Sequence, residues 1–206
     1  MKKSIKGTQT EKNLLKSFAG ESQARSRYEF AAQAAMEEGY GTIASIFTAT
    51  AIHEQQHAIK FFTYLEGGEV EITAAYPAGK TGDTKANLIA AAQGEHEENT
   101  NLYPRFAQTA EEEGFGEIAA TFRSIAAVEQ LHETRFRKIL ERENACEGRC
   151  SGTVKTKDRN RVFQNNINHQ WYCRNCGHIH FAASPLKSCP TCMNTNCFEI
   201  KDNNYV

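Results

Sequence analysis

Apolar side chains recur at alternating intervals of three and four residues through most of the first 144 positions, with polar residues between them. This spacing puts the apolar residues on one face of a helix and is typical of helices that pack in a bundle. A capping box formed by Thr8 and Glu11 marks the start of the first helix, and Asp83 or Thr84 can cap the third. The pattern predicts helices at about 9–38, 43–66, 84–113 and 118–139.

The segment between the second and third predicted helices decides the topology of the bundle. Residues 69–83 are rich in Gly and contain Pro77, which argues against a continuous helix there. A connection of this length can cross the bundle instead of turning back at once. The sequence therefore predicts an all-α four-helix bundle with one long crossover, the ferritin-like arrangement.

The helical region contains an internal repeat of a helix, a Gly-aromatic-Gly turn and a second helix. The second copy has one additional residue between Glu95 and Tyr103. Because an inserted residue inside a helix commonly produces a π-bulge, we expect one at this point. The matched positions include Tyr28 and Tyr103, Gly39 and Gly114, Glu54 and Glu129, and His57 and His132.

Charged residues occupy the middle of all four apolar stripes, where a bundle normally buries hydrocarbon. Unpaired carboxylates in such a core cost several kcal/mol each, and Arg25 is the only cation near the predicted centre. A Glu from each of two helices and a Glu-x-x-His from each of the other two is the pattern of dinuclear iron carboxylate sites. The candidate ligands are Glu21, Glu54, His57, Glu95, Glu98, Glu129 and His132.

Each of these features also has an ordinary structural interpretation. A lone Glu-x-x-His usually lies on a solvated helix face, but here two copies occupy equivalent positions of a duplicated unit. Tyr28 and Tyr103 could be plain core aromatics, although a hydrogen bond to a ligand carboxylate is the favoured interpretation. Glu98 could be an exposed helix residue, and its spacing of three from Glu95 favours a ligand instead.

The length and charge of the chain argue against nucleic-acid-binding, membrane and secreted proteins. The 206 residues include 24 Lys and Arg and 25 Asp and Glu, a formal net charge of -1. This balance argues against a nucleic-acid partner, and the longest uncharged stretch, residues 39–52, is too short to span a membrane. The basic start is not followed by the apolar core of a secretory signal. We therefore expect a cytoplasmic protein, in which thiols stay reduced.

Beyond position 144 the composition changes, and all seven cysteines lie there. Four of them form two C-x-x-C knuckles, whose spacing predicts a tetrahedral thiolate site for iron or zinc. Zinc would make the site a structural staple, whereas iron would make it a one-electron relay. The knuckle cysteines are Cys173, Cys176, Cys189 and Cys192. The others, Cys146, Cys150 and Cys197, are predicted to be free thiols, with a linker disulfide or adventitious metal as alternatives.

The repeated bundle with its Glu and Glu-x-x-His positions, followed by the C-x-x-C-G and C-P-x-C knuckles, resembles the rubrerythrin family over about residues 5–143 and 170–200. The resemblance implies that the seven bundle candidates hold two irons, that Glu54 and Glu129 bridge them, and that Glu98 and His57 exchange at one iron. It implies a mononuclear iron on the four knuckle cysteines and places Tyr28 and Tyr103 beside the ligands. The implied domains are ferritin-like 1–144, linker 145–169 and rubredoxin-like 170–206.

The same resemblance implies a function. It points to reduction of hydrogen peroxide to water, with electrons relayed through the four-cysteine iron from an external donor, either rubredoxin or an NAD(P)H-dependent reductase. It also implies a homodimer in which one small domain lies near the other subunit's di-iron site. Two alternatives remain open at this point: a ferroxidase for iron storage, and a bundle scaffold with a zinc ribbon that contacts protein or nucleic acid.

Overall fold

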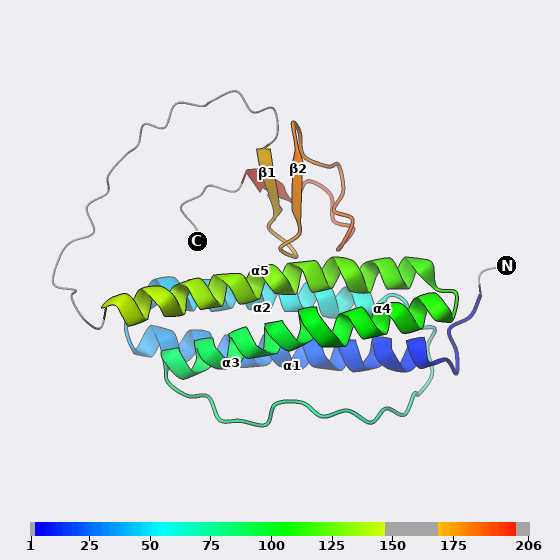
Figure 1. The fold of residues 1–206 in the computed structure, drawn as a ribbon, viewed down its shortest axis with the longest axis horizontal. Helices are drawn as coiled ribbons and strands as arrows, with labels where there is room; N and C mark the ends of the chain where they lie inside the picture. The colour runs from blue at the N-terminus through cyan, green and yellow to red at the C-terminus, as the bar shows by residue number, and fades with distance from the viewer. Residues whose placement is uncertain (1–2, 147–168, 201–206) are drawn as a thin grey trace.

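The computed structural model describes residues 3–146 and 169–200, which form a long helical bundle carrying a small β-domain on one side (Figure 1). The small domain stands above α5 and α2, and α1 and α3 lie on the opposite side of the bundle. A four-helix bundle with one long crossover is therefore confirmed. The helices are α1 (Gln9–Glu37), α2 (Gly41–Phe62), α3 (Thr84–Glu97), α4 (Tyr103–Glu112) and α5 (Gly116–Cys146).

Side chains cap α1 and α3 where the sequence predicts. Thr8 Oγ1 accepts a hydrogen bond from the Glu11 amide at 3.2 Å, and the Glu11 carboxylate accepts one from the Gly7 amide at 2.8 Å. Asp83 accepts a bond from the Ala86 amide at 2.8 Å. These bonds satisfy amides that have no partner inside the first turn of a helix, so both starting points are well defined.

The third predicted helix is continuous in space but changes its winding. A π-helical turn, η1 (Glu98–Leu102), separates α3 from α4. The turn takes up the additional residue of the second repeat, so Glu95 and Tyr103 both remain buried on the inner face. The predicted π-bulge is confirmed.

The two repeats end their first helices in the same way. The Gly39 amide donates to the Met36 carbonyl at 3.1 Å, and the Gly114 amide makes the equivalent bond to Glu111 at 2.9 Å. Both glycines have positive φ, +86° and +79°, a conformation that carries little strain only for glycine.

The crossover returns the chain to the far end of the bundle. It joins α2 to α3 and runs along the length of the bundle on the side of α1 and α3 (Figure 1). The Tyr76 hydroxyl donates to the Lys16 carbonyl on α1 at 2.7 Å. At its end, the Thr84 amide donates to the carboxylate of Glu38, just beyond the last turn of α1. The crossover is thus attached to α1 near both ends of that helix.

The apolar core is divided into two clusters. One contains Tyr28, Phe47, Leu88 and Phe136, together with many alanines. The other contains the side chains of Leu14, Phe61, Tyr103, Phe122 and Ile125. On every helix the predicted ligand positions lie between the residues of the two clusters, so the polar layer is closed off by hydrocarbon at both ends.

The small domain is a three-stranded antiparallel sheet with strand order β2-β1-β3. Its strands are β1 (His169–Cys173), β2 (Ile179–Ala182) and β3 (Phe198–Ile200). Helix α5 extends two residues past the predicted boundary at 144, and β1 begins at His169. Most of the predicted linker, including Cys150, lies outside the described residues.

None of the helices in the described part of the chain has both the length and the hydropathy that a membrane crossing requires.

Phe122 provides a test of the packing. Its ring is fully buried against Phe61, Tyr103 and Phe106, with centroid separations of 5.0–5.9 Å. We expect Phe122→Ala to lower the free energy of unfolding by about 3–5 kcal/mol, because it removes buried area and leaves a cavity. The matched control is Phe30→Ala. Phe30 is 54% exposed, so this substitution should lower the free energy of unfolding by less than about 0.5 kcal/mol. Equal losses in urea denaturation would contradict this packing.

Candidate metal centres

The bundle brings six of the seven predicted ligands into one buried layer. Each of the six side chains is at most 1% exposed, and together they come from α1, α2, α3 and α5. The six side chains lie in one layer across the bundle because each occupies the middle of the apolar stripe of its helix. The six are Glu21, Glu54, His57, Glu95, Glu129 and His132.

The six residues form two overlapping groups whose potential ligand atoms lie within 4.8 Å of one another. Glu54 and Glu129 belong to both groups. The first group adds Glu21 and His57, and the second adds Glu95 and His132. Two ion positions that share two carboxylates are what a carboxylate-bridged dinuclear site requires.

The shared carboxylates each turn one oxygen to each histidine. Glu129 lies 2.9 Å from His57 Nδ1 through one oxygen and 2.8 Å from His132 Nδ1 through the other. Glu54 does the same at 3.1 Å and 3.2 Å. Both histidines therefore face the carboxylates with Nδ1 and leave Nε2 pointing out of the site.

Several of these buried atoms form no hydrogen bond of acceptable geometry among the described residues, although some of them lie within 3.5 Å of an imidazole nitrogen. They are Glu21 Oε2, Glu54 Oε1, Glu95 Oε2, both carboxylate oxygens of Glu129, and His132 Nδ1. Such atoms carry a large desolvation cost unless a cation is buried with them. A set of carboxylate oxygens and imidazole nitrogens suits iron, and the residues present fit a dinuclear iron site.

Two tyrosines hold the carboxylates that do not bridge. The Tyr28 hydroxyl donates to Glu95 Oε1 at 2.5 Å, and the Tyr103 hydroxyl donates to Glu21 Oε1. Each tyrosine thus reaches the glutamate of the other repeat, across the bundle. Both tyrosine rings pack in the apolar core, and both hydroxyls donate a hydrogen bond to a carboxylate. The predicted hydrogen bonds are therefore confirmed.

The structure does not bring Glu98 into either group. Glu98 is half-buried at the first position of the π-helical turn. Burial and the negative charges of Glu95 and Glu129 raise its pKa well above the ordinary value, so it lies within electrostatic reach of the site. His57 completes the first group, and the exchange of Glu98 and His57 at one iron stays a prediction.

The expectation for Arg25 is wrong. Its side chain is 40% exposed and pairs with Glu29 at 3.0 Å, on the outside of α1. The arginine whose charge lowers the pKa of Glu98, against the effect of burial, is Arg27. The spacing of residues along α1 did not show whether the Arg25 side chain points into the bundle or out to solvent.

The four knuckle cysteines form a second cluster, with their sulfur atoms also within 4.8 Å of one another. Cys176 Sγ lies 3.7 Å from Cys173 Sγ and 3.5 Å from Cys189 Sγ, and Cys173 Sγ lies 3.8 Å from Cys192 Sγ. Hydrogen bonding to Cys176 lowers the pKa of Cys173 to about 6. Four thiols this close fit one tetrahedral iron, as in rubredoxin-like domains.

Cys197 lies beside this cluster, with its sulfur donating to the Asn194 carbonyl at 3.2 Å. The side chain of Cys146 lies outside the described residues, as does Cys150.

The small domain contacts the bundle through both of its knuckles. His57 Nε2 lies 3.1 Å from the Cys176 carbonyl oxygen, and Asn175 Nδ2 donates to Gln56 Oε1 at 2.9 Å. A separate contact joins Ser124 on α5 to Thr191 of the second knuckle at 2.6 Å. A hydrogen bond to one of the knuckle cysteines therefore starts from a histidine of the carboxylate layer.

His53 is a buried polar residue that belongs to none of the sequence motifs. Its Nδ1 lies 2.9 Å from His132 Nε2, and its Nε2 lies 2.7 Å from the Tyr172 hydroxyl of β1. Burial, with the positive charges of His132 and Arg135, lowers the pKa of His53 well below its ordinary value. The repeat carries a signal for it, because the equivalent position in the second copy is Val128.

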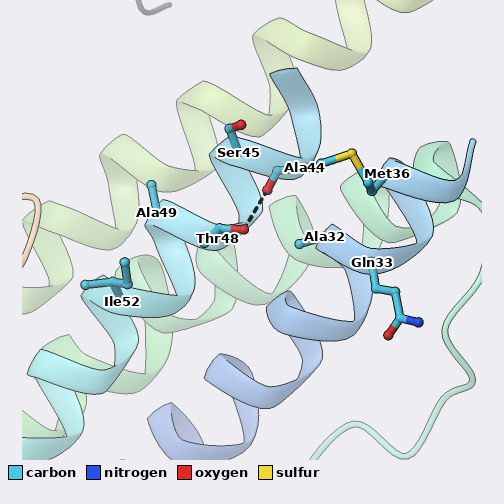
Figure 2. Close-up of a pocket in the computed structure, with 8 residues that line it drawn as sticks. All are labelled: Ala32, Gln33, Met36, Ala44, Ser45, Thr48, Ala49 and Ile52. Atoms are coloured by element: carbon cyan, nitrogen blue, oxygen red, sulfur yellow. Dashed lines mark hydrogen bonds between the residues drawn. The ribbon is translucent and has the colours of Figure 1, made fainter. Parts of the chain in front are cut away.

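An open pocket of about 510 Å³ lies elsewhere, on the outer surface between α1 and α2 (Figure 2). Met36 and Ile52 contribute apolar surface, and the Thr48 hydroxyl is bonded to the Ala44 carbonyl at 3.0 Å. None of its eight lining residues is a His, Cys, Asp or Glu, so this pocket offers no metal ligand.

Comparisons with known proteins agree with both sites. A sequence model of the family described as Rubrerythrin matches residues 12–140. Rubrerythrin from Porphyromonas gingivalis is 50% identical over 206 residues, 100% of this chain and 96% of that protein. Rubrerythrin from Nitratidesulfovibrio vulgaris is 46% identical over 204 residues, 98% of this chain and 100% of that protein. A solved structure of fully reduced, all-ferrous nigerythrin matches with a TM-score of 0.63 and 26% identity, over 96% of this chain and 92% of that chain.

The pKa values predict how the metal-free protein responds to pH. Burial and the charge of Glu54 raise the pKa of Glu95 to about 8, from an ordinary value of 4.5. Burial opposes the shift of His57, but Glu129 and Glu54 raise its pKa to about 10, from 6.5. Above these ordinary values the unfolded chain releases protons that the folded chain retains, so stability falls as pH rises.

We therefore expect the melting temperature of the metal-free protein to fall between about pH 5.5 and 8.5. Metal ions compete with protons for the same atoms, so the gain in melting temperature on adding ferrous iron anaerobically should grow with pH. Circular dichroism melts with and without metal measure both. A metal-free melting temperature that rises over this range would contradict the assignment.

Proposed function

Since the chain belongs to the rubrerythrin family, we propose that it reduces hydrogen peroxide to water at the dinuclear site and receives the electrons through the four-cysteine site. Peroxidase activity in the response to oxidative stress is the general role of the family. The reaction consumes two electrons and two protons per peroxide and releases two waters. The proposed dinuclear ligands are Glu21, Glu54, His57, Glu95, Glu129 and His132, with Glu98 as an alternative to His57, and those of the mononuclear iron are Cys173, Cys176, Cys189 and Cys192.

One observation carries the proposal: the hydrogen bond from His57 Nε2 to the carbonyl oxygen of Cys176. Cys176 belongs to the four-thiol cluster, and His57 Nδ1 faces the bridging carboxylates. The two sites are thus joined by the His57 side chain, one hydrogen bond, and the main chain and side chain of Cys176. A ferroxidase that stores iron has no use for such a connection, whereas an enzyme that must reload with electrons does.

When bound, the two irons supply two electrons and Lewis acidity for cleavage of the peroxide O–O bond. The chain's own residues prepare the site for that chemistry. Glu54 and Glu129 belong to both groups and would bridge the two irons. The hydroxyl groups of Tyr28 and Tyr103 donate hydrogen bonds to the two carboxylates that do not bridge, at Glu95 Oε1 and Glu21 Oε1. The apolar clusters above and below exclude water from the carboxylate layer.

Electrons have to come from another protein. Rubredoxin-type proteins are the general electron donors of the family. We propose rubredoxin or an NAD(P)H-dependent reductase as the donor. We also propose a cytoplasmic homodimer, with the domain limits 1–144, 145–169 and 170–206. In the single chain that the structure describes, the small domain contacts its own bundle, and contact with another subunit's bundle stays a prediction.

An anaerobic experiment tests the function. The iron-loaded protein is reduced and then mixed with stoichiometric peroxide or with oxygen in parallel, and the ferric-thiolate absorption is followed in time. We expect the colour to return much faster with peroxide than with oxygen, because the four-cysteine site gives up its electron to the oxidised dinuclear site. Faster oxidation by oxygen with accumulating iron would favour the ferroxidase, and absence of the colour would show zinc on the cysteines.

A substitution at Glu98 provides a second test. The proposed role of Glu98 as an alternative iron ligand to His57 rests on the family resemblance. We expect Glu98→Ala to leave the bundle folded and to slow peroxide turnover by about 10–100-fold, the range found when groups supporting a metal site are removed. The control is Glu97→Ala, which removes a carboxylate from the exposed side of the same helical turn. Unchanged turnover in an iron-loaded Glu98→Ala protein would remove Glu98 from the mechanism.

A further inference from the structure

His53 forms a hydrogen-bonded bridge between the bundle and the small domain. Its side chain is 1% exposed, and both ring nitrogens are hydrogen-bonded. One bond leads to His132 in the carboxylate layer, and the other leads to Tyr172, the residue before Cys173 in the small domain. The two ring nitrogens of His53 therefore have partners in different domains.

The metal-facing atom of His132 sets the direction of these hydrogen bonds. Its Nδ1 lies near oxygens of Glu54 and Glu129 and is the nitrogen that would hold the metal. The ring proton is then on Nε2, since a ligating imidazole is neutral and keeps one proton. His132 Nε2 donates to His53 Nδ1, and His53 Nε2 donates to the Tyr172 hydroxyl oxygen.

The other histidine of the site is arranged in the same way. His57 faces the shared carboxylates with Nδ1, and its Nε2 donates to the Cys176 carbonyl oxygen at 3.1 Å. The outer nitrogens of both histidines thus end on the small domain. His57 reaches it directly, whereas His132 reaches it through His53.

The backbone of the first knuckle lies close enough to require this fit. Gly177 has φ +80°, and a Cβ added to it would lie 2.9 Å from Val128 Cγ1 and 3.1 Å from His53 Nδ1. It would also lie 3.4 Å from His132 Nε2. A glycine is needed for this approach, which brings the knuckle into contact with both rings.

The internal repeat shows that the position itself does not demand a histidine. Val128 is the counterpart of His53 and is also 1% exposed. Both residues lie against Gly177, yet only His53 has a hydrogen-bonding ring. Of the two partners of His53, His132 belongs to the bundle and Tyr172 to the small domain, so the docked small domain supplies the bond at Nε2.

We propose that His53 is a positioning residue that, with Tyr172, forms a second hydrogen-bonded connection between the four-cysteine module and the dinuclear site. It orients the ring of His132 and gives each metal position its own link to the small domain. The inference rests on the proposed function, because the connection matters only if electrons pass between the two sites.

Single-turnover kinetics test the connection in the reduced, iron-loaded protein after a peroxide pulse. We expect His53→Val and Tyr172→Phe to leave oxidation of the dinuclear site fast and to slow the return of ferric-thiolate colour about tenfold, as for loss of one hydrogen bond. His53→Gln, which can both accept and donate, should remain closer to wild type. If the wild-type protein shows no peroxide-driven return of colour, the proposed function fails, independently of the variants.

A second measurement does not depend on activity. In zinc-loaded protein with ¹⁵N-labelled histidine, NMR should show protected ring N–H protons on Nε2 of both His53 and His132. The His132 signal should lose its protection in His53→Val, and the His53 signal should lose it in Tyr172→Phe. Tyr172→Phe keeps the ring that packs on His53, so a folding defect is not expected from that variant.

Asn175→Ala is the matched control. It removes another hydrogen bond across the same contact, from Asn175 to Gln56 at 2.9 Å, without touching a histidine. We expect it to preserve the His53 and His132 signals and to slow the return of colour less than Tyr172→Phe does. Wild-type signals and rates in Tyr172→Phe and His53→Val would overturn the proposal. Equal slowing in Asn175→Ala and Tyr172→Phe, with both signals intact, would overturn it as well.

Discussion

The burial of acidic side chains in the middle of a bundle is the constraint on which the rest of the molecule depends. Glu54 and Glu129 are at most 1% exposed and face each other across two histidines. Carboxylates in hydrocarbon are tolerated only with positive charge beside them and hydrogen bonds on their free oxygens. Tyr28 and Tyr103 supply such bonds across the bundle, and the two apolar clusters close the layer. The fold is thus organised around acidic groups that the metal-free chain keeps buried by holding protons on residues such as Glu95 and His57, whose pKa values are raised to about 8 and about 10.

Much of this arrangement was accessible from the sequence, because it follows from short-range periodicity. Seam positions locate the helices, and a Glu in the seam of each helix locates the layer. The additional residue before Tyr103 predicted η1, since only a wider turn keeps both flanking residues inside. Periodicity was less informative for Arg25, because a long charged side chain at the edge of a stripe can bend to either side. Glu98 lies outside both groups, at the first position of the π-helical turn.

The contact between the small domain and the bundle could not be predicted in the same way. The C-x-x-C spacing indicates a thiolate site because its ligands are close in sequence. In contrast, Asn175 meets Gln56 and Tyr172 meets His53 through contacts between residues far apart in the chain. No local pattern specifies such pairs. The only trace in the sequence is that one copy of the repeat has His53 where the other has Val128.

The π-helical turn also bears on the history of the molecule. A residue added to an α-helix rotates everything after it by about 100°, which would turn Tyr103 away from Glu21. The wider turn cancels that rotation, so a duplicated gene can gain one codon without losing the tyrosine contact. The two halves are then no longer interchangeable. The two repeats therefore differ in structure. Glu21 lies on a regular α-helix, whereas Glu95 lies just before a π-helical turn.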